Sequence, residues 1–153
     1  LRAEVTPLLQ WVIENRRPGD VMYVYYNGQP VFEYYAPRYG WNRGNTIAGA
    51  CSRFRPQGYV DQIGQLRGRR RVWVLVVSGA SVRGFEEDRV IVGFFEHIGK
   101  RLDDRVTVGA RMYLYDLGAE GPPPEPFRGI VPPLWLDPAM DCRGAWEPLN
   151  QLR

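Results

Sequence analysis

The chain has 153 residues, of which 44% are hydrophobic and 24% are charged, and its formal net charge is +3. These values are typical of an ordinary globular protein with a single domain. The sequence contains no apolar stretch of about 18 residues, so no membrane-spanning helix is predicted. The net charge is also too small to favour a nucleic-acid-binding protein, and no nucleic-acid partner is expected.

The first predicted helix covers residues 3–16, where apolar side chains recur at helical spacing. These side chains are Val5, Leu8, Leu9, Val12 and Ile13. Pro7 is tolerated only in a first turn, so the regular part is expected to begin near Thr6. We expect residues 16–17, both arginine, in the last turn, where they favour the helix dipole.

A strand is predicted over residues 21–26, which form a nearly continuous apolar and aromatic run. The strand ends at residues 27–28, Asn-Gly, which favour a turn. Pro30 suits the first position of a short helix, and Pro37 would end that helix.

Three weaker segments follow. Residues 37–45 have the composition of a loop, and residues 46–51 are a weak strand candidate. A helix is predicted over residues 59–66, and a basic cluster at 67–71 leads the chain into the next strand. This cluster is interpreted as a solvated turn, although it could also contact anionic lipid or nucleic acid.

The segment on which the fold prediction depends is residues 72–77, an unbroken apolar run dominated by valine. A half-exposed strand would alternate apolar and polar residues, so this run predicts a strand that is covered on both faces. A buried helix is the alternative, but six residues are few for a helix and the β-branched content disfavours one.

The strongest helical pattern runs from residue 86 to residue 102. Acidic residues 86–88 would lie in its first turn, and residues 100–101, Lys-Arg, would close its last turn. The predicted buried face consists of Val90, Ile91, Phe94, Phe95, Ile98 and Leu102. His97, the one histidine of the chain, is interpreted as a structural residue at or near the surface.

After this helix, residues 106–108 and 112–115 form either two short strands or one strand with a bulge at Gly109. We predict an α/β sandwich domain over residues 1–117, and a Pro-rich, irregular tail over residues 118–153 that packs back on it. The alternation of helices and strands predicts a small, mostly parallel sheet with helices on both faces, in a Rossmann-like or flavodoxin-like arrangement.

The two cysteines, Cys51 and Cys142, match no metal-binding spacing, and two interpretations of them stay open. They either form one disulfide in an oxidising compartment or are two buried, reduced thiols.

No catalytic or metal-binding constellation is present, so no catalytic residue and no cofactor are predicted. In particular, residues 78–81, Ser-Gly-Ala-Ser, lack the Gly-x-Ser-x-Gly pattern of a nucleophile elbow. In an open parallel sheet, ligands bind where the strands end. The candidate ligand-binding residues, which would suit a phosphate or sugar hydroxyls, are therefore Tyr26, Asn27, Gly28, Arg53, Ser78, Gly79, Ser81 and Arg83.

The tyrosine pairs at 25–26 and 34–35 are predicted to place one ring of each pair inward. The outward partners could stack on a sugar or lie at a membrane interface.

The segments 17–26 and 30–36, together with 71–75 and 113–117, resemble a stretch that follows the last membrane helix of bacterial polytopic glycosyltransferases. This class uses polyprenyl-phosphate sugars and is related to protein mannosyltransferases and lipid A aminoarabinose transferases. The resemblance covers residues 1–117.

The resemblance implies an extracytoplasmic, periplasmic-side C-terminal domain of a membrane-associated enzyme, excised here from a longer chain. Its partners would be the membrane part of the same polypeptide and a polyprenyl-phosphate sugar or glycan acceptor. The catalytic acidic residues of that class lie nearer the membrane helices, so none is carried over and the domain is expected to be inactive alone. The alternatives are a free-standing module that binds a nucleotide or flavin, and a protein-interaction domain.

Overall fold

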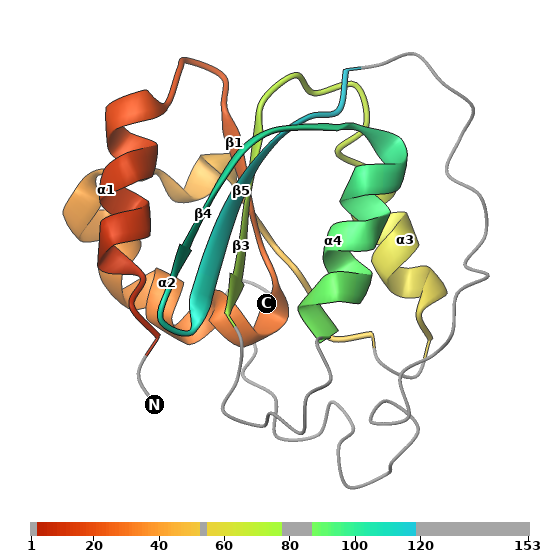
Figure 1. Cartoon of the computed structure of the whole chain (residues 1–153), viewed down its shortest axis with the longest axis horizontal. Helices are drawn as coiled ribbons and strands as arrows, with labels where there is room; N and C mark the ends of the chain where they lie inside the picture. Colours follow the sequence, from red (N-terminus) through yellow and green to blue (C-terminus); the bar gives the residue numbers. More distant parts are fainter. Residues whose placement is uncertain (1–2, 53–54, 78–86, 119–153) are drawn as a thin grey trace, which may run out of the picture.

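The computed structural model describes residues 3–52, 55–77 and 87–118. This part of the chain folds into a mixed α/β structure with a five-stranded sheet (Figure 1). The helices are α1 (Thr6–Asn15), α2 (Gln29–Tyr35), α3 (Gln57–Gly64) and α4 (Glu87–Ile98). The strands are β1 (Val21–Val24), β2 (Thr46–Ala48), β3 (Val72–Val77), β4 (Lys100–Thr107) and β5 (Ala110–Asp116). Three short 3₁₀ helices are η1 (Tyr26–Gly28), η2 (Ala36–Tyr39) and η3 (Arg43–Asn45).

The strands lie in the order β2-β1-β3-β5-β4, with β3 at the centre. Strand β1 is parallel to both β2 and β3, and Val21 is aligned with Val72. Strand β5 is antiparallel to β3, and β4 is antiparallel to β5. The N-terminal half of the sheet is therefore parallel, and the C-terminal half is an antiparallel hairpin.

The prediction for β3 is confirmed, because this strand is buried on both faces over almost its whole length. Val72, Val74 and Val76 face one hydrophobic cluster, while Trp73 and Leu75 face the other. A strand covered from both sides has no solvent-facing positions that require polar side chains. This is why its sequence is apolar without interruption.

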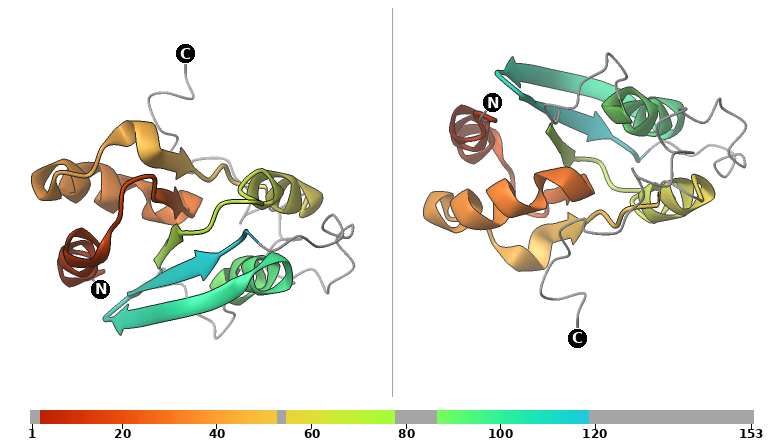
Figure 2. Two further views of the ribbon diagram at one scale, coloured as in Figure 1. Left: turned by 90° about the horizontal axis from the view of Figure 1, so that it is seen from above. Right: turned by 90° about the horizontal axis from the view of Figure 1, so that it is seen from below.

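Two helical layers supply the cover (Figure 1, Figure 2). On one face, α3 and α4 contribute Tyr59, Ile63, Ile91 and Phe95 to a core that includes Tyr23 of β1. On the other face, the α1 and α2 side contributes side chains that pack on Met22, Trp73 and Met112. The covering residues on that side include Leu8, Leu9, Val12 and Phe32.

The last part of the fold departs from the predicted parallel arrangement. The alternatives left open at Gly109 resolve into two strands, since β4 and β5 form a hairpin. Gly109 has φ of +72°, a conformation that glycine adopts more readily than other residues. A hairpin can be closed by a tight turn, whereas a parallel neighbour would need a longer crossover.

The predicted end of the long helix is wrong. Helix α4 ends at Ile98, and Lys100 and Arg101 already belong to β4 instead of the last helical turn. Leu102, predicted to be buried, lies in that strand with 45% of its surface exposed. The chain turns at Gly99, where only glycine fits, because an added Cβ would lie 2.5 Å from the carbonyl oxygen of Asp116.

Smaller corrections concern the other element ends. Residues 16–17 follow α1 instead of forming its last turn, since Arg16 is already extended. The predicted strand 21–26 ends at Val24, and its last residue begins η1. The Pro-rich tail and its packing lie outside the described residues, apart from Gly118.

Candidate ligand-binding site

The sequence places its candidate site where β1 and β3 end, which is here called the carboxyl edge of the sheet. Tyr26, Asn27 and Gly28 do lie at this edge, in η1 immediately after β1. Gly28 packs closely there, because an added Cβ would lie 3.1 Å from Cγ2 of Val77. The other predicted site residues, Arg53, Ser78, Gly79, Ser81 and Arg83, lie outside the described residues.

Two amide side chains close the carboxyl edge. Asn27 donates from Nδ2 to the carbonyl oxygen of Val77 at 2.6 Å, and so joins the end of β1 to the end of β3. Gln29, fully buried, donates from Nε2 to the carbonyl oxygen of Val24 at 2.7 Å. The acceptor oxygens of both amides are buried and have no partner among the described residues. A ligand here would therefore have to supply N–H or O–H donors, which suits sugar hydroxyls better than a phosphate.

The tyrosine prediction is correct for one pair and wrong for the other. Tyr25 and Tyr26 are both buried, because Tyr26 turns back into η1 and packs edge-on against Tyr25. Tyr34 is 59% exposed, and the guanidinium of Arg38 lies 4.1 Å from the centre of its ring. One exposed tyrosine thus remains for the predicted stacking role.

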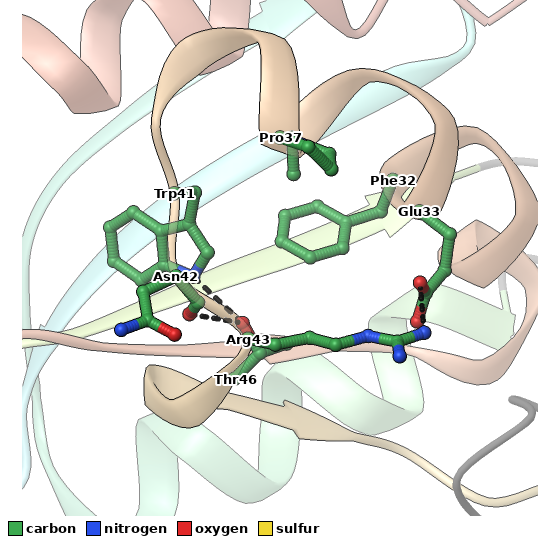
Figure 3. A pocket seen from close by; sticks show the side chains of 8 residues that line it. Phe32, Glu33, Pro37, Trp41, Asn42, Arg43 and Thr46 are labelled. Carbon is green, nitrogen blue, oxygen red and sulfur yellow. Dashed lines mark hydrogen bonds and ion pairs between the residues drawn. The ribbon is translucent and has the colours of Figure 1, made fainter.

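A pocket that the sequence did not predict lies between α2, η2, η3 and the start of β2 (Figure 3). Its volume is about 290 Å³, near the lower end of the range for small-molecule sites. We call it the Trp41 pocket, and it is lined by Phe32, Glu33, Ala36, Pro37, Trp41, Asn42, Arg43 and Thr46.

The aromatic wall of this pocket is held in place by several bonds. The indole Nε1 of Trp41 donates to Oγ1 of Thr46 at 2.7 Å, and its backbone N–H donates to the carbonyl oxygen of Ala36 at 3.1 Å. The Thr46 hydroxyl in turn donates to the carbonyl oxygen of Asn42 at 3.4 Å. The wall is therefore formed before any ligand arrives, which lowers the entropy cost of binding.

The rim of the Trp41 pocket is charged. Arg43 extends along one side of the pocket toward Glu33, and the two side chains form an ion pair at 2.5 Å (Figure 3). Glu33 is partly buried, whereas most of Arg43 is exposed to solvent. The pair offers acceptor oxygens and N–H donors beside an apolar wall, a combination that can bind hydroxyl groups around a ring.

A second hollow of about 280 Å³ adjoins the first, and Trp41 lines both. The other residues of this basic hollow are Arg16, Arg17, Pro18, Gly19, Asp20 and Asn45. Arg16 donates to the carbonyl oxygen of Gly40 at 3.2 Å, and its guanidinium lies 5.8 Å from the centre of the Trp41 ring. Both hollows thus open near the ends where β1 and β2 begin, opposite the predicted edge.

No group of three or more His, Cys, Asp or Glu side chains in the described part of the chain could hold a metal ion. His97 is exposed on α4, as predicted, and that helix covers the face of the sheet opposite α1. Cys51 packs against the core and lies 3.9 Å from the hydroxyl of Tyr59, while Cys142 lies outside the described residues. Their pairing stays a prediction.

The sequence contained one signal for the Trp41 pocket. Residues 37–45 have loop composition, yet they include Trp41, Asn42 and Arg43 in succession. A large aromatic residue between polar ones in a loop is a feature of binding sites. Phe32 and Glu33 lie on a separate helix, and only the tertiary fold brings them beside this loop.

Comparison with protein families, curated proteins and solved structures finds no match to the chain. In the three described ranges, no helix combines the length and the apolar character needed to cross a membrane. The assignment of function therefore depends on the geometry of the pockets and on the physical chemistry of the groups that line them.

Proposed function

We propose that this domain is a non-catalytic module that binds a carbohydrate in the Trp41 pocket. The single observation that carries the proposal is the pairing of a fixed aromatic wall with a charged rim in one small pocket. The apolar face of a sugar ring suits such a wall, while its hydroxyls need donors and acceptors at the side. Glu33 and Arg43 supply both kinds of group.

We further propose that the module is the extracytoplasmic accessory domain of a membrane glycosyltransferase. In that role it would hold an acceptor glycan or the sugar of a polyprenyl-phosphate donor, while the reaction takes place in the membrane part of the same polypeptide. The parallel half of the sheet, with helices on both faces, supports a distant kinship to Rossmann-like domains. The role predicts that the coding sequence upstream of residue 1 encodes many apolar helices. A complete short reading frame that starts near Leu1 would contradict it.

Calorimetric titration of the domain with a panel of monosaccharides and short glycans tests the binding function. We expect Glu33→Gln and Arg43→Gln each to weaken binding of the preferred sugar by about 10- to 150-fold, because a hydrogen bond to a charged group contributes about 1.5–3 kcal/mol. Arg43 is mostly exposed and Glu33 is partly exposed, and each change keeps a polar side chain of similar size, so neither should unfold the domain.

The matched control is a second exposed ion pair, between Arg55 and Asp61 on the α3 side, with an N–O distance of 3.8 Å. Arg55→Gln and Asp61→Asn remove the same charges outside the pocket, and sugar affinity should stay unchanged. Absence of binding to every sugar in the panel would refute the proposal. Equal losses in the pocket variants and the control variants would refute it as well.

One observation favours a second candidate, a module that binds a nucleotide or flavin at the carboxyl edge. The unpartnered acceptor oxygens of Asn27 and Gln29 could accept from the amino group of a base or from a ribose hydroxyl. A thermal-shift screen with nucleotides and flavins tests this candidate. Stabilisation that is lost in Asn27→Asp would support it, and no stabilisation by any of these compounds would exclude it.

A further inference from the structure

Basic residues concentrate where the strands begin, which we call the amino edge of the sheet. Val21 is aligned with Val72 at this edge, and Lys100 is aligned with Asp116. Tyr115, the neighbour of Asp116, pairs with Val72. The turn before β1, the loop before β3 and the start of β4 thus meet at one end of the molecule (Figure 1). Figure 2 (left) looks down on this end.

Each of these segments carries arginine or lysine. Arg16 and Arg17 precede β1, and Arg43 precedes β2. Four arginines lie in residues 67–71, before β3, and Lys100 is the first residue of β4. Neighbouring strands lie about 4.8 Å apart, so the charges extend over roughly 20 Å across the five strands. The fold therefore gathers basic residues that are dispersed in the sequence.

The acidic groups at this edge accept hydrogen bonds, and the exposed one at the end of α1, Glu14, accepts from Nε2 of Gln10 at 2.8 Å. Asp20 is buried and accepts from Nε of Arg71 at 3.0 Å and from Nε1 of Trp73 at 2.9 Å. Glu96 accepts from Arg101 and from the hydroxyl of Tyr115. The carboxylate of Asp116 accepts from the backbone N–H of Gly118 at 2.8 Å.

Four cations at this edge, in contrast, are exposed and have no partner among the described residues: Arg17, Arg69, Arg70 and Lys100. The loop that carries two of them is fixed to the end of β5. Gly68 donates to the carbonyl oxygen of Leu117 at 2.7 Å, and Leu117 donates to the carbonyl oxygen of Arg69 at 2.8 Å. The positive surface is therefore held in place, although the long side chains on it can adapt to a partner.

The spacing of these charges decides between possible partners. A single small anion needs donors that converge on one point, whereas these cations are distributed along the edge. Single-stranded nucleic acid would use a series of exposed aromatic rings for base stacking, whereas the described part of this edge offers at most the largely buried ring of Trp41. Leu102, beside Lys100 and Arg101, adds an exposed apolar side chain that can insert between headgroups.

We propose that the amino edge docks the domain on an anionic phospholipid surface. This inference goes beyond sugar binding and does not require it. It places the Trp41 pocket beside the lipid headgroups, because Trp41 also lines the basic hollow formed by Arg16 and Arg17.

Co-sedimentation with vesicles tests the proposal, with vesicles of phosphatidylcholine alone or mixed with phosphatidylglycerol. We expect binding to the mixed vesicles only, and we expect its loss at about 1 M salt, where the Debye length falls to about 3 Å. A triple variant, Arg17→Gln, Arg69→Gln and Arg70→Gln, should bind about a hundredfold more weakly, since each charge contributes about fivefold.

A second triple variant is the charge-matched control: Arg55→Gln, Arg105→Gln and Arg111→Gln, all exposed residues away from the amino edge. It should bind mixed vesicles as the unchanged domain does, and Glu33→Gln should do so as well. Failure of the unchanged domain to bind mixed vesicles would overturn the proposal. Equal weakening in the two triple variants, or equal binding to neutral vesicles, would also overturn it.

Discussion

Asp20 accepts a hydrogen bond from the indole Nε1 of Trp73 at 2.9 Å, in the interior of the protein. The same carboxylate accepts from Nε of Arg71 at 3.0 Å and from the backbone N–H of Arg17 at 3.0 Å. One side chain thus joins the turn before β1 to the start of β3. Trp73 also packs edge-on against Trp11 of α1, with ring centres 5.1 Å apart.

Removal of this carboxylate should destabilise the fold strongly. We expect Asp20→Ala to lower the free energy of unfolding by about 3–5 kcal/mol, because it leaves Arg71 and the indole N–H of Trp73 without their acceptor. Urea unfolding measures the change. The control is Asp61→Ala, which removes an exposed carboxylate and should cost less than about 1 kcal/mol. Similar losses in both variants would show that Asp20 does not organise the two strands.

Two buried tyrosines predict how stability depends on pH. Burial raises the pKa of Tyr23 above its ordinary value of 10, and burial together with a hydrogen bond to Glu96 does the same for the pKa of Tyr115. Above pH 10 the unfolded chain loses these protons while the folded chain keeps them. The free energy of unfolding should therefore have its full value below pH 10 and fall as the pH rises further. The slope is up to about 1.4 kcal/mol per pH unit for each tyrosine.

Urea unfolding at a series of alkaline pH values checks this dependence, with Tyr23→Phe as the diagnostic variant. The slope above pH 10 should be smaller in Tyr23→Phe, because one of the two groups is gone. Identical slopes in the variant and the unchanged domain would contradict the assignment.

The same two tyrosines should respond differently to loss of the hydroxyl at neutral pH. The hydroxyl of Tyr23 is buried without a partner among the described residues, whereas that of Tyr115 donates to Glu96 at 2.9 Å. Tyr23→Phe should therefore be neutral or slightly stabilising, and Tyr115→Phe should cost about 1 kcal/mol. Thermal unfolding of both variants checks the order, and a larger loss in Tyr23→Phe would reverse our interpretation of the core.

The cysteine pairing is open to a direct chemical test. If Cys51 and Cys142 form a disulfide, neither will react with iodoacetamide in denaturant until a reductant is added. Reduction should then lower the free energy of unfolding by about 2–5 kcal/mol, since the bond would close a long loop. Alkylation of both residues without reductant would establish the alternative, two reduced thiols.

Local sequence predicted those parts of the fold that depend on hydrophobic pattern. The valine-rich run at β3 has one physical explanation, burial on both faces, and the structure confirms it. The helical spacing likewise predicted α1, and Pro7 placed its start near Thr6, where the helix begins. In each case the burial pattern repeats over several residues, so the signal is strong.

The errors arose where contacts between distant parts of the chain decided the structure. Leu102 continues the helical spacing of Ile98, but Gly99 between them allows a close approach to Asp116 that ends the helix. The order of the last strands depends on pairing with β3, which no local pattern encodes. The Trp41 pocket was missed for a similar reason, since its walls come from α2, η2, η3 and β2.

The most direct test of carbohydrate binding is an NMR titration with the preferred sugar, read at the tryptophan indole N–H signals. Trp11, Trp41 and Trp73 all pack in one hydrophobic cluster, but of the three only Trp41 lines the pocket. We expect the Trp41 signal and the amides around Arg43 to shift, and the signals of Trp11 and Trp73 to stay unchanged. Shifts confined to Asn27, Gly28 and Gln29, with Trp41 unmoved, would place the ligand at the carboxyl edge and contradict our account.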